Sequence, residues 1–381
     1  MSDRVKALEL ENQKLRAASQ KTIRVEDLDA TNAEVATLKK QNADTNWAEK
    51  IKWQGDFRYR YENIKEEDSK NRHRHRISAR PGLVAKTSPT TEMGFGLATG
   101  GDNPVSTMQT LGDGGTKKDI DLDLAYLKWN AFENTFVNAG KFANPFFAVQ
   151  KSQLIWDSDY RPEGGAINWT DQTFFANAGY SFIESDSAVG AYGISAAQFG
   201  ANFKPFDDTT LTAAVAYYDI PTKGEEPSYN DDFFGNASVV KNGVEVYEFN
   251  HQLVNASLNV GINAFDLPLY LYADYVENQD VNNLETGYML GIQLGNSKNK
   301  GTWHVLYQYE DLEANATLGL ITASDFGGGG TDVKGSTFAA RYAIDNQWFV
   351  GTTYYFDNKT GVALGDNENY DRIQLDTGFT Y

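Results

Sequence analysis

Cysteine is absent from the 381 residues of this sequence. Its absence excludes disulfides and thiolate metal sites, and it is compatible with an envelope protein that faces an oxidising compartment. Runs of about 18 apolar residues are also lacking, which excludes a membrane-spanning helix. Lys and Arg number 34 against 52 Asp and Glu, and the net charge of −18 argues against nucleic-acid binding. The first residues form no charged and apolar leader, so for an exported protein we expect a signal peptide that was removed or replaced.

Aromatic residues and glycine are abundant instead. The chain contains 21 Tyr, 22 Phe and 34 Gly, and aromatic residues make up 13% of it. The mean hydropathy is nevertheless low, at −0.51. A barrel that is wet inside and apolar outside combines these properties. The length would allow two ordinary domains, but barrels run larger as single units.

Between Trp53 and Arg80 charged and apolar residues alternate with a period of two. This period is typical of strands, because successive side chains leave a strand on opposite faces. A soluble sandwich would turn the charged face toward bulk water, whereas an outer-membrane barrel would turn it toward a water-filled lumen. Six of the twelve arginines of the chain share this face: Arg58, Arg60, Arg72, Arg74, Arg76 and Arg80.

Residues 1–46 contain no aromatic residue and differ from everything after them. An apolar seam with Asn at one position, a pattern typical of coiled coils, runs through Val5, Leu8, Asn12 and Leu15, and again through Val35, Leu38 and Asn42. Short helices of this kind are marginal alone, so we expect them to associate with copies of themselves. We predict a periplasmic coiled-coil stalk over 1–46 and a barrel domain over 47–381. The alternative is a solvated N-terminal arm.

From Trp47 onward the sequence alternates between candidate strands and turn signals. Sixteen strands are predicted, over about 50–62, 72–85, 90–100, 119–131, 134–143, 161–170, 173–184, 189–203, 208–219, 250–262, 267–277, 284–295, 300–311, 331–344, 347–357 and 369–381. Connections after the even-numbered strands are short, and most of those after the odd-numbered strands are long. This alternation predicts an all-β fold, a 16-stranded antiparallel transmembrane β-barrel with tight periplasmic turns and long external loops.

One long loop, from Asn144 to Gly165, is too apolar to extend into water. We expect it to fold into the lumen and to bring Asp157, Asp159 and Glu163 opposite the arginine-rich face. Opposed rows of charge would then form a pore constriction that orients and filters solutes. The alternative is a local group of salt bridges that only holds the loop. The other long loops, including Asp325–Asp332, are acidic and rich in glycine or asparagine, and we expect them outside the barrel.

Catalysis has little support in the sequence. A nucleophile elbow, a zinc-protease motif and a phosphate-binding loop are all missing. His251 and Ser257 would share a strand face, but among so many serines this spacing is expected by chance. We therefore expect a protein that is not an enzyme and that needs no cofactor and no metal.

Several segments resemble the putative porin family of Gram-negative outer membranes. They are WQGDFRYRYE (53–62), RHRHR (72–76), ATGGDNPVST (98–107), QTLG (109–112), LAYLKW (124–129) and WDSDYRPEG (156–164). The resemblance implies a general-porin-like barrel, usually trimeric and preceded by a coiled coil. It further implies passive diffusion of ions and small hydrophilic solutes, with the barrel seated in outer-membrane lipid and lipopolysaccharide.

Two further functions stay open at this point. The barrel could chiefly be an anchor, with residues 1–46 contacting peptidoglycan or a periplasmic partner. The arginine-rich face could also make the channel selective for anions or for one class of substrate. The sequence alone does not choose between these functions and general diffusion, because the net charge of the pore depends on which acids line it.

Overall fold

The computed structural model describes residues 2–19, 31–37, 50–185, 190–363, 365 and 367–381. The chain divides into two compact units, Met1–Ile51 and Lys52–Tyr381. In the first unit, helix α1 spans Ser2–Ser19 and residues 31–37 are helical as well. None of the described helices is long and apolar enough to cross a membrane. Leu38, Asn42 and the expected domain boundary at 46/47 lie outside the described residues.

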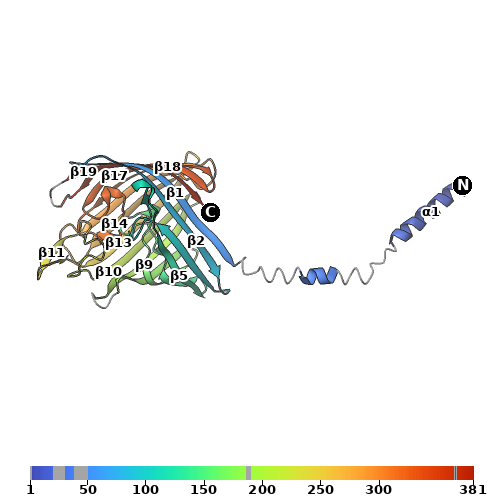
Figure 1. The fold of residues 1–381 in the computed structure, drawn as a ribbon, viewed down its shortest axis with the longest axis horizontal. Coiled ribbons are helices and arrows are strands. Elements are labelled where there is room, and N and C mark those ends of the chain that lie inside the picture. Colours follow the sequence, from blue (N-terminus) through green and yellow to red (C-terminus); the bar gives the residue numbers. More distant parts are fainter. Residues whose placement is uncertain (1, 20–30, 38–49, 186–189, 364, 366) are drawn as a thin grey trace. The chain divides into compact units, whose positions relative to one another are not determined.

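The second unit is a closed antiparallel barrel (Figure 1). Its sixteen long strands are β1 (Ile51–Glu66), β2 (Arg72–Lys86), β3 (Thr91–Thr99), β5 (Ile120–Phe132), β6 (Thr135–Lys141), β7 (Glu163–Thr170), β8 (Phe174–Glu184), β9 (Tyr192–Phe206), β10 (Thr209–Ile220), β13 (His251–Ala264), β14 (Leu267–Asn278), β15 (Thr286–Gly295), β16 (Trp303–Leu312), β17 (Val333–Asp345), β18 (Trp348–Thr360) and β19 (Glu368–Thr380). Each strand pairs with the next, and β1 pairs with β19 to close the barrel.

The predicted sixteen-stranded barrel is therefore confirmed. Three short strands were not predicted. The two-residue β4 (Gln109–Thr110) extends the pairing along β2 beyond the end of β3. Strands β11 (Ser238–Lys241) and β12 (Val244–Tyr247) form a separate hairpin in the long connection between β10 and β13.

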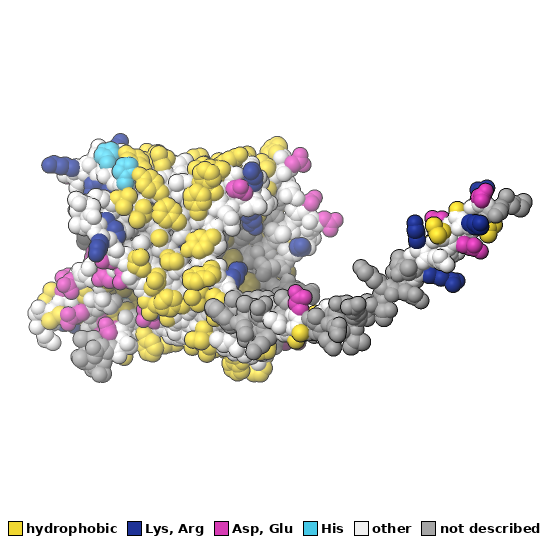
Figure 2. All heavy atoms as spheres, turned by 45° about the vertical axis from the view of Figure 1, so that its right-hand side comes forward, with side chains coloured by type: hydrophobic (Ala, Val, Ile, Leu, Met, Phe, Trp, Pro, Cys, Tyr) yellow, Lys and Arg dark blue, Asp and Glu magenta, His cyan; other side chains and the backbone are white. Residues whose placement is uncertain are grey.

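The barrel wall follows the alternation of its sequence. In β10, Ala214, Ala216 and Tyr218 are buried, whereas Val215 and Tyr217 between them are exposed. Figure 2 shows apolar side chains spread over the outer wall between the two ends of the barrel. An apolar outer band is what a barrel needs to lie in lipid, because hydrocarbon cannot solvate charge.

Two long connections fold into the barrel and contribute half of its main buried apolar cluster. We call residues 142–162, between β6 and β7, the first inward loop, and residues 313–332, between β16 and β17, the second inward loop. Their buried apolar side chains form one cluster with those of strands β9, β10, β13, β14, β16 and β17. The first loop contains the 3-10 turn η2 (Val149–Lys151), and the second contains η3 (Gly319–Ile321) and η4 (Phe326–Gly328). The apolar loop expected to enter the lumen thus does so, but the loop with Asp325 was wrongly expected outside.

Candidate pore constriction

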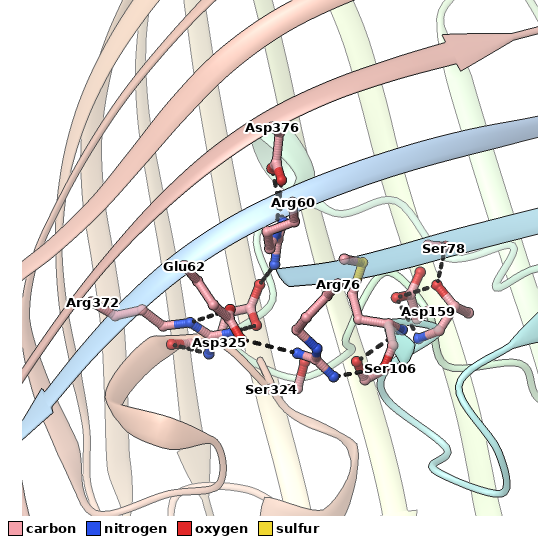
Figure 3. Close-up of polar contacts among 12 residues, drawn as sticks. Arg60, Glu62, Arg76, Ser78, Ser106, Asp159, Ser324, Asp325, Arg372 and Asp376 are labelled. Carbon is pink, nitrogen blue, oxygen red and sulfur yellow. Dashed lines mark hydrogen bonds and ion pairs between the residues drawn. The ribbon is translucent and has the colours of Figure 1, made fainter. Parts of the chain in front are cut away.

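The arginine-rich faces of β1 and β2 point into the barrel, where Arg60 joins β1 to β19 and to a loop. Its guanidinium lies 2.7 Å from Asp376 on β19 and 2.9 Å from Asp325 in the second inward loop (Figure 3). The Arg60 side chain is only 4% exposed. The register explains the first contact, because Arg60 and Asp376 are cross-strand partners. Arg60 thus connects the barrel wall to a loop that the sequence did not place inside.

Glu62, two residues further along β1, holds three arginines. Its carboxylate lies 2.6 Å from Arg74, 3.6 Å from Arg76 and 2.5 Å from Arg372. Arg372 also lies 2.8 Å from Asp325, which joins the groups around Arg60 and Glu62 into one network (Figure 3). Because the Glu62 side chain is fully buried, its charge depends on these partners. The network therefore compensates much of the positive charge that the sequence concentrates on this face.

Asp325 is the contribution of the second inward loop to the network. Burial by itself would favour the neutral acid, but the guanidiniums of Arg372 and Arg60 hold the pKa of Asp325 well below its usual range. Asp325 is therefore ionised at any physiological pH. It ties this loop to β1 and β19 through two charge-assisted contacts.

Of the three candidate acids, one on the first inward loop meets an arginine. Asp159 lies 2.8 Å from Arg80, whose other partner is Asp56 at 2.9 Å. The backbone N–H and hydroxyl of Thr107 also donate to Asp159, each over 3.2 Å. This contact crosses from the loop to β2.

Asp157 faces the second inward loop rather than the arginines. Its carboxylate accepts the N–H groups of Asp159, at 2.7 Å, and Ser324, at 2.9 Å. Its own N–H donates to the carbonyl of Ile321 over 2.7 Å. Burial raises the pKa of Asp157 to about 7, helped by the Asp159 carboxylate and opposed by the two N–H groups. Asp157 thus joins the two loops and titrates near neutrality.

Glu163 and Arg72 lie away from the buried network. Glu163 pairs with Lys141 at 2.5 Å and its side chain is 59% exposed. Arg72 pairs with Glu66 at 2.7 Å and its side chain is half exposed. Exposed pairs of this kind contribute little to stability, roughly 0–1 kcal/mol. The structure therefore does not bring these two residues to the centre of the site.

Arg58 differs from the other five arginines, since it has no ion pair with any described residue. It lines a cavity of about 650 Å³, together with Lys151 and with Arg341, which was not singled out from the sequence. Sequence reasoning also missed Glu62, Arg372, Asp325 and Asp376. A signal existed for the strand residues, because Arg372 and Asp376 alternate with apolar residues just as the β1 arginines do. Among the residues that the structure describes, no cluster of His, Asp and Glu suited to a metal ion occurs.

A closed antiparallel barrel with an apolar outer wall and a charged interior defines the class of outer-membrane channel proteins. Residues 63–231 and 236–377 match the family described as Putative porin. Because the match covers most of the chain, the protein belongs to this putative porin family, which is a family of channels and not of enzymes. Its barrel is thus that of a channel of the bacterial outer membrane.

Solved porins share the fold at low sequence identity. The structure of OprB from Pseudomonas putida at high pH matches with a TM-score of 0.59 and 13% identity, over 90% of this chain and 97% of that chain. OmpF from Salmonella typhi, in a complex with daunomycin, matches with a TM-score of 0.53 and 13% identity, over 87% of this chain and 97% of that chain. A comparison with curated proteins gives no significant match.

Proposed function

We propose that the protein is a porin through which ions and small hydrophilic solutes diffuse passively past a charged constriction. The observation that carries this proposal is that both inward loops reach the charged wall, through Asp159 on Arg80 and Asp325 on Arg60 and Arg372. Fixed charges of both signs at a narrowed lumen orient dipolar solutes and filter ions. Membership of the porin family supports the same function, and the proposal involves no reaction and no cofactor.

The constriction in this proposal contains the residues expected from the sequence, with unequal roles. Arg60, Arg74, Arg76 and Arg80 are compensated by carboxylates, whereas Arg58 keeps a free charge among the described residues. Arg58 should therefore contribute more to ion selectivity than any other arginine of this face. Arg72 and Glu163 lie away from the buried network and would have little effect on selectivity. Asp157 would act indirectly, through its contact with the second inward loop.

Conductance in a planar lipid bilayer under a salt gradient tests this proposal. Stepwise openings are expected, and their arrival in groups of three would support a homotrimer. Replacing the six arginines by Gln should shift the reversal potential toward cation selectivity. An unchanged reversal potential would overturn their role, and silence from well-folded protein would overturn the open channel.

The N-terminal unit suggests how the copies associate. Val5, Leu8 and Leu15 of α1 are 54%, 58% and 63% exposed, so the single chain offers them no cover. We propose that α1 forms a periplasmic coiled coil with copies of itself, because such a seam is buried only by another helix. In this proposal three barrels share one stalk over 1–46, each barrel being surrounded by outer-membrane lipid and lipopolysaccharide. Cross-linking of introduced Leu8→Cys residues with a linker that carries three thiol-reactive arms should give trimers, and persistent monomers would contradict the coiled coil.

The same exposed seam favours a second candidate function, in which the barrel anchors the stalk to the membrane. Residues 1–46 would then bind peptidoglycan or a periplasmic partner. Sedimentation of the purified full-length protein with isolated cell wall tests this role, with a variant lacking residues 2–46 as the control. Sedimentation that requires those residues supports an anchor, and equal sedimentation of both proteins would contradict it.

A further inference from the structure

The cavity of about 650 Å³ lies between the first inward loop and the inner wall formed by β1, β2, β17 and β18. Its volume suits a small organic solute rather than a single ion. Cations and carboxylates both line it, so its net character depends on which of them are already paired.

Three of the lining cations have no ion pair with any described residue. They come from three separate elements, with Arg58 on β1, Lys151 on the first inward loop and Arg341 on β17. Arg341 stacks on the ring of Phe349 instead, with its Cζ 3.4 Å from the ring centroid, and its Nε is buried without a hydrogen-bond partner. Stacking of this kind fixes the guanidinium plane while its terminal N–H groups stay available.

The carboxylates that line the cavity are engaged by other groups. Asp56 and Asp159 both pair with Arg80. Asp157 accepts two backbone N–H groups. Arg161, a further lining cation, is paired with Asp123 at 3.3 Å. The charge left uncompensated in this cavity is therefore positive, and it is carried by Arg58, Lys151 and Arg341.

The wall and the loop both show adaptations that hold these cations in place. Arg58, Gly378 and Phe349 are cross-strand neighbours in one row, and a side chain at Gly378 would come within 2.5 Å of the Phe349 ring. Glycine at this position therefore gives the ring its place beside Arg341. On the loop, Gln150 and Lys151 have φ values of 45° and 62°, which non-glycine residues rarely adopt. A hydrogen bond of 3.1 Å from Gln150 to Asn259 on β13 fixes this turn.

We propose that this cavity binds a small multivalent oxyanion, an organic solute with several carboxylate or phosphate groups, through Arg58, Lys151 and Arg341. The inference rests on the proposed channel function, because it names the class of solute that the pore would favour. Three cations from three directions match several anionic groups on one molecule better than they match a single chloride. Each contact is a charge-assisted hydrogen bond, the strong kind.

Citrate and inorganic phosphate are suitable probes, and binding is measured by calorimetric titration of the full-length protein in detergent at low salt. Low salt matters because ionic strength screens exposed charges. We expect one saturable citrate site per chain and weaker binding of phosphate, which carries fewer groups. Each of Arg58→Gln, Lys151→Gln and Arg341→Gln should weaken citrate binding by about tenfold. Lys300→Gln, in an exposed turn, is the matched control and should bind as the unaltered protein does.

Arg341→Lys separates charge from geometry, since it keeps the cation and loses the planar fork. Its affinity for citrate should lie between that of the unaltered protein and that of Arg341→Gln. A mere folding defect would not produce this intermediate affinity. Absence of saturable binding, equal binding by the triple Gln variant, or equal binding of uncharged sucrose would overturn the inference. Bilayer conductance tests the channel separately. Protein that binds citrate but conducts nothing refutes the proposed function, whereas a conducting pore without citrate binding refutes only this site.

Discussion

The two inward loops enter the same barrel by different means. The first is held by large apolar side chains, among them Phe146, Leu154 and Trp156, which pack into the interior core. The second consists largely of small or polar residues, and every residue from 314 to 323 is nevertheless buried. Leu318, Leu320, Ile321 and Phe326 join the same core, and polar attachments hold the rest, with Asp325 on two arginines and Asn236 on three backbone groups of the loop.

This difference shows that apolar content is only one route to burial. Small residues allow the backbone of the second loop to come close to its neighbours, and Gly319 has the carbonyl of Phe234 within 2.1 Å of the position of a Cβ. A backbone buried this closely must have its N–H and C=O groups satisfied by specific partners. The second loop should therefore depend on a few polar residues, and the first on apolar packing.

The largest effect should come from removing the charged attachment of the second loop. Asp325→Ala leaves Arg60 and Arg372 each short of one buried partner, and loss of one member of a buried pair costs about 3–5 kcal/mol. We expect the second loop to leave the lumen, so that single-channel conductance rises and anion selectivity increases. Protease cleavage within 313–332 should appear, while the first loop stays protected.

Asp371→Ala is the matched control for this change, because Asp371 is a neighbouring acid on β19 that forms no ion pair with the described residues of the network. It should leave conductance and cleavage as in the unaltered protein. If Asp325→Ala conducts as the unaltered protein does, the ion pairs do not hold the second loop. The two loops would then not differ in how they are attached.

The sequence predicted that the first loop is buried but not that the second loop is. Period-two alternation located all sixteen long strands, and the aromatic residues near Trp156 indicated burial of the first loop. In residues 313–332 a few apolar residues, Leu318, Leu320, Ile321 and Phe326, are scattered among alanine, glycine, threonine and asparagine, which are common in exposed loops as well. Their burial depends on contacts with Asn236 and Arg372, which lie far away in the sequence.

The candidate site, too, could be predicted from the sequence only in part. The position of Arg60 on a charged inner face follows from alternation, but its partners follow from strand register and loop position. Asp376 becomes its neighbour only when β1 closes the barrel against β19. Asp157 and Glu163 lie close to Asp159 in sequence, yet their side chains engage a loop backbone and Lys141. Short spacing therefore did not determine which acid met an arginine.

The next effect in size should follow from Trp156→Ala in the first loop. Trp156 is buried and contacts Phe146 and Tyr218, with ring centroids 6.2 Å and 5.7 Å away. Loss of a buried aromatic side chain costs about 3 kcal/mol or more, through lost burial and the cavity left behind. Amide hydrogen exchange should accelerate over 146–156 more than over 314–323. Trp156→Phe should restore most of the protection, and equal acceleration of both loops would argue against separate anchoring.

Asn236→Ala should have a smaller effect on the second loop alone. The Asn236 amide donates 2.7 Å hydrogen bonds to the carbonyls of Ala314 and Thr317, and its oxygen accepts the N–H of Gly319 at 2.8 Å. Alanine removes the partner of these buried backbone groups, and water that enters the space of the lost amide replaces part of the hydrogen bonding, so that a net cost of about 1–3 kcal/mol is expected. Exchange should accelerate over 314–320. Glu226→Ala, in the same long connection but exposed, is the control. Protection that survives Asn236→Ala would show that small-residue packing suffices without this anchor.

The smallest effect should be a pH dependence where the two loops meet. Asp157 has a pKa raised from 3.8 to about 7, so the joined loops favour its protonated form. The contact is therefore strongest below about pH 4, and it weakens as the pH rises toward 7, because ionising the buried acid costs more than ionising an exposed one. Exchange over 319–324, corrected for intrinsic rates, should accelerate from pH 5 to 7 and level off above. Asp157→Asn should remove this dependence, since its amide does not titrate, and a dependence that persists in the variant would assign the effect to another group.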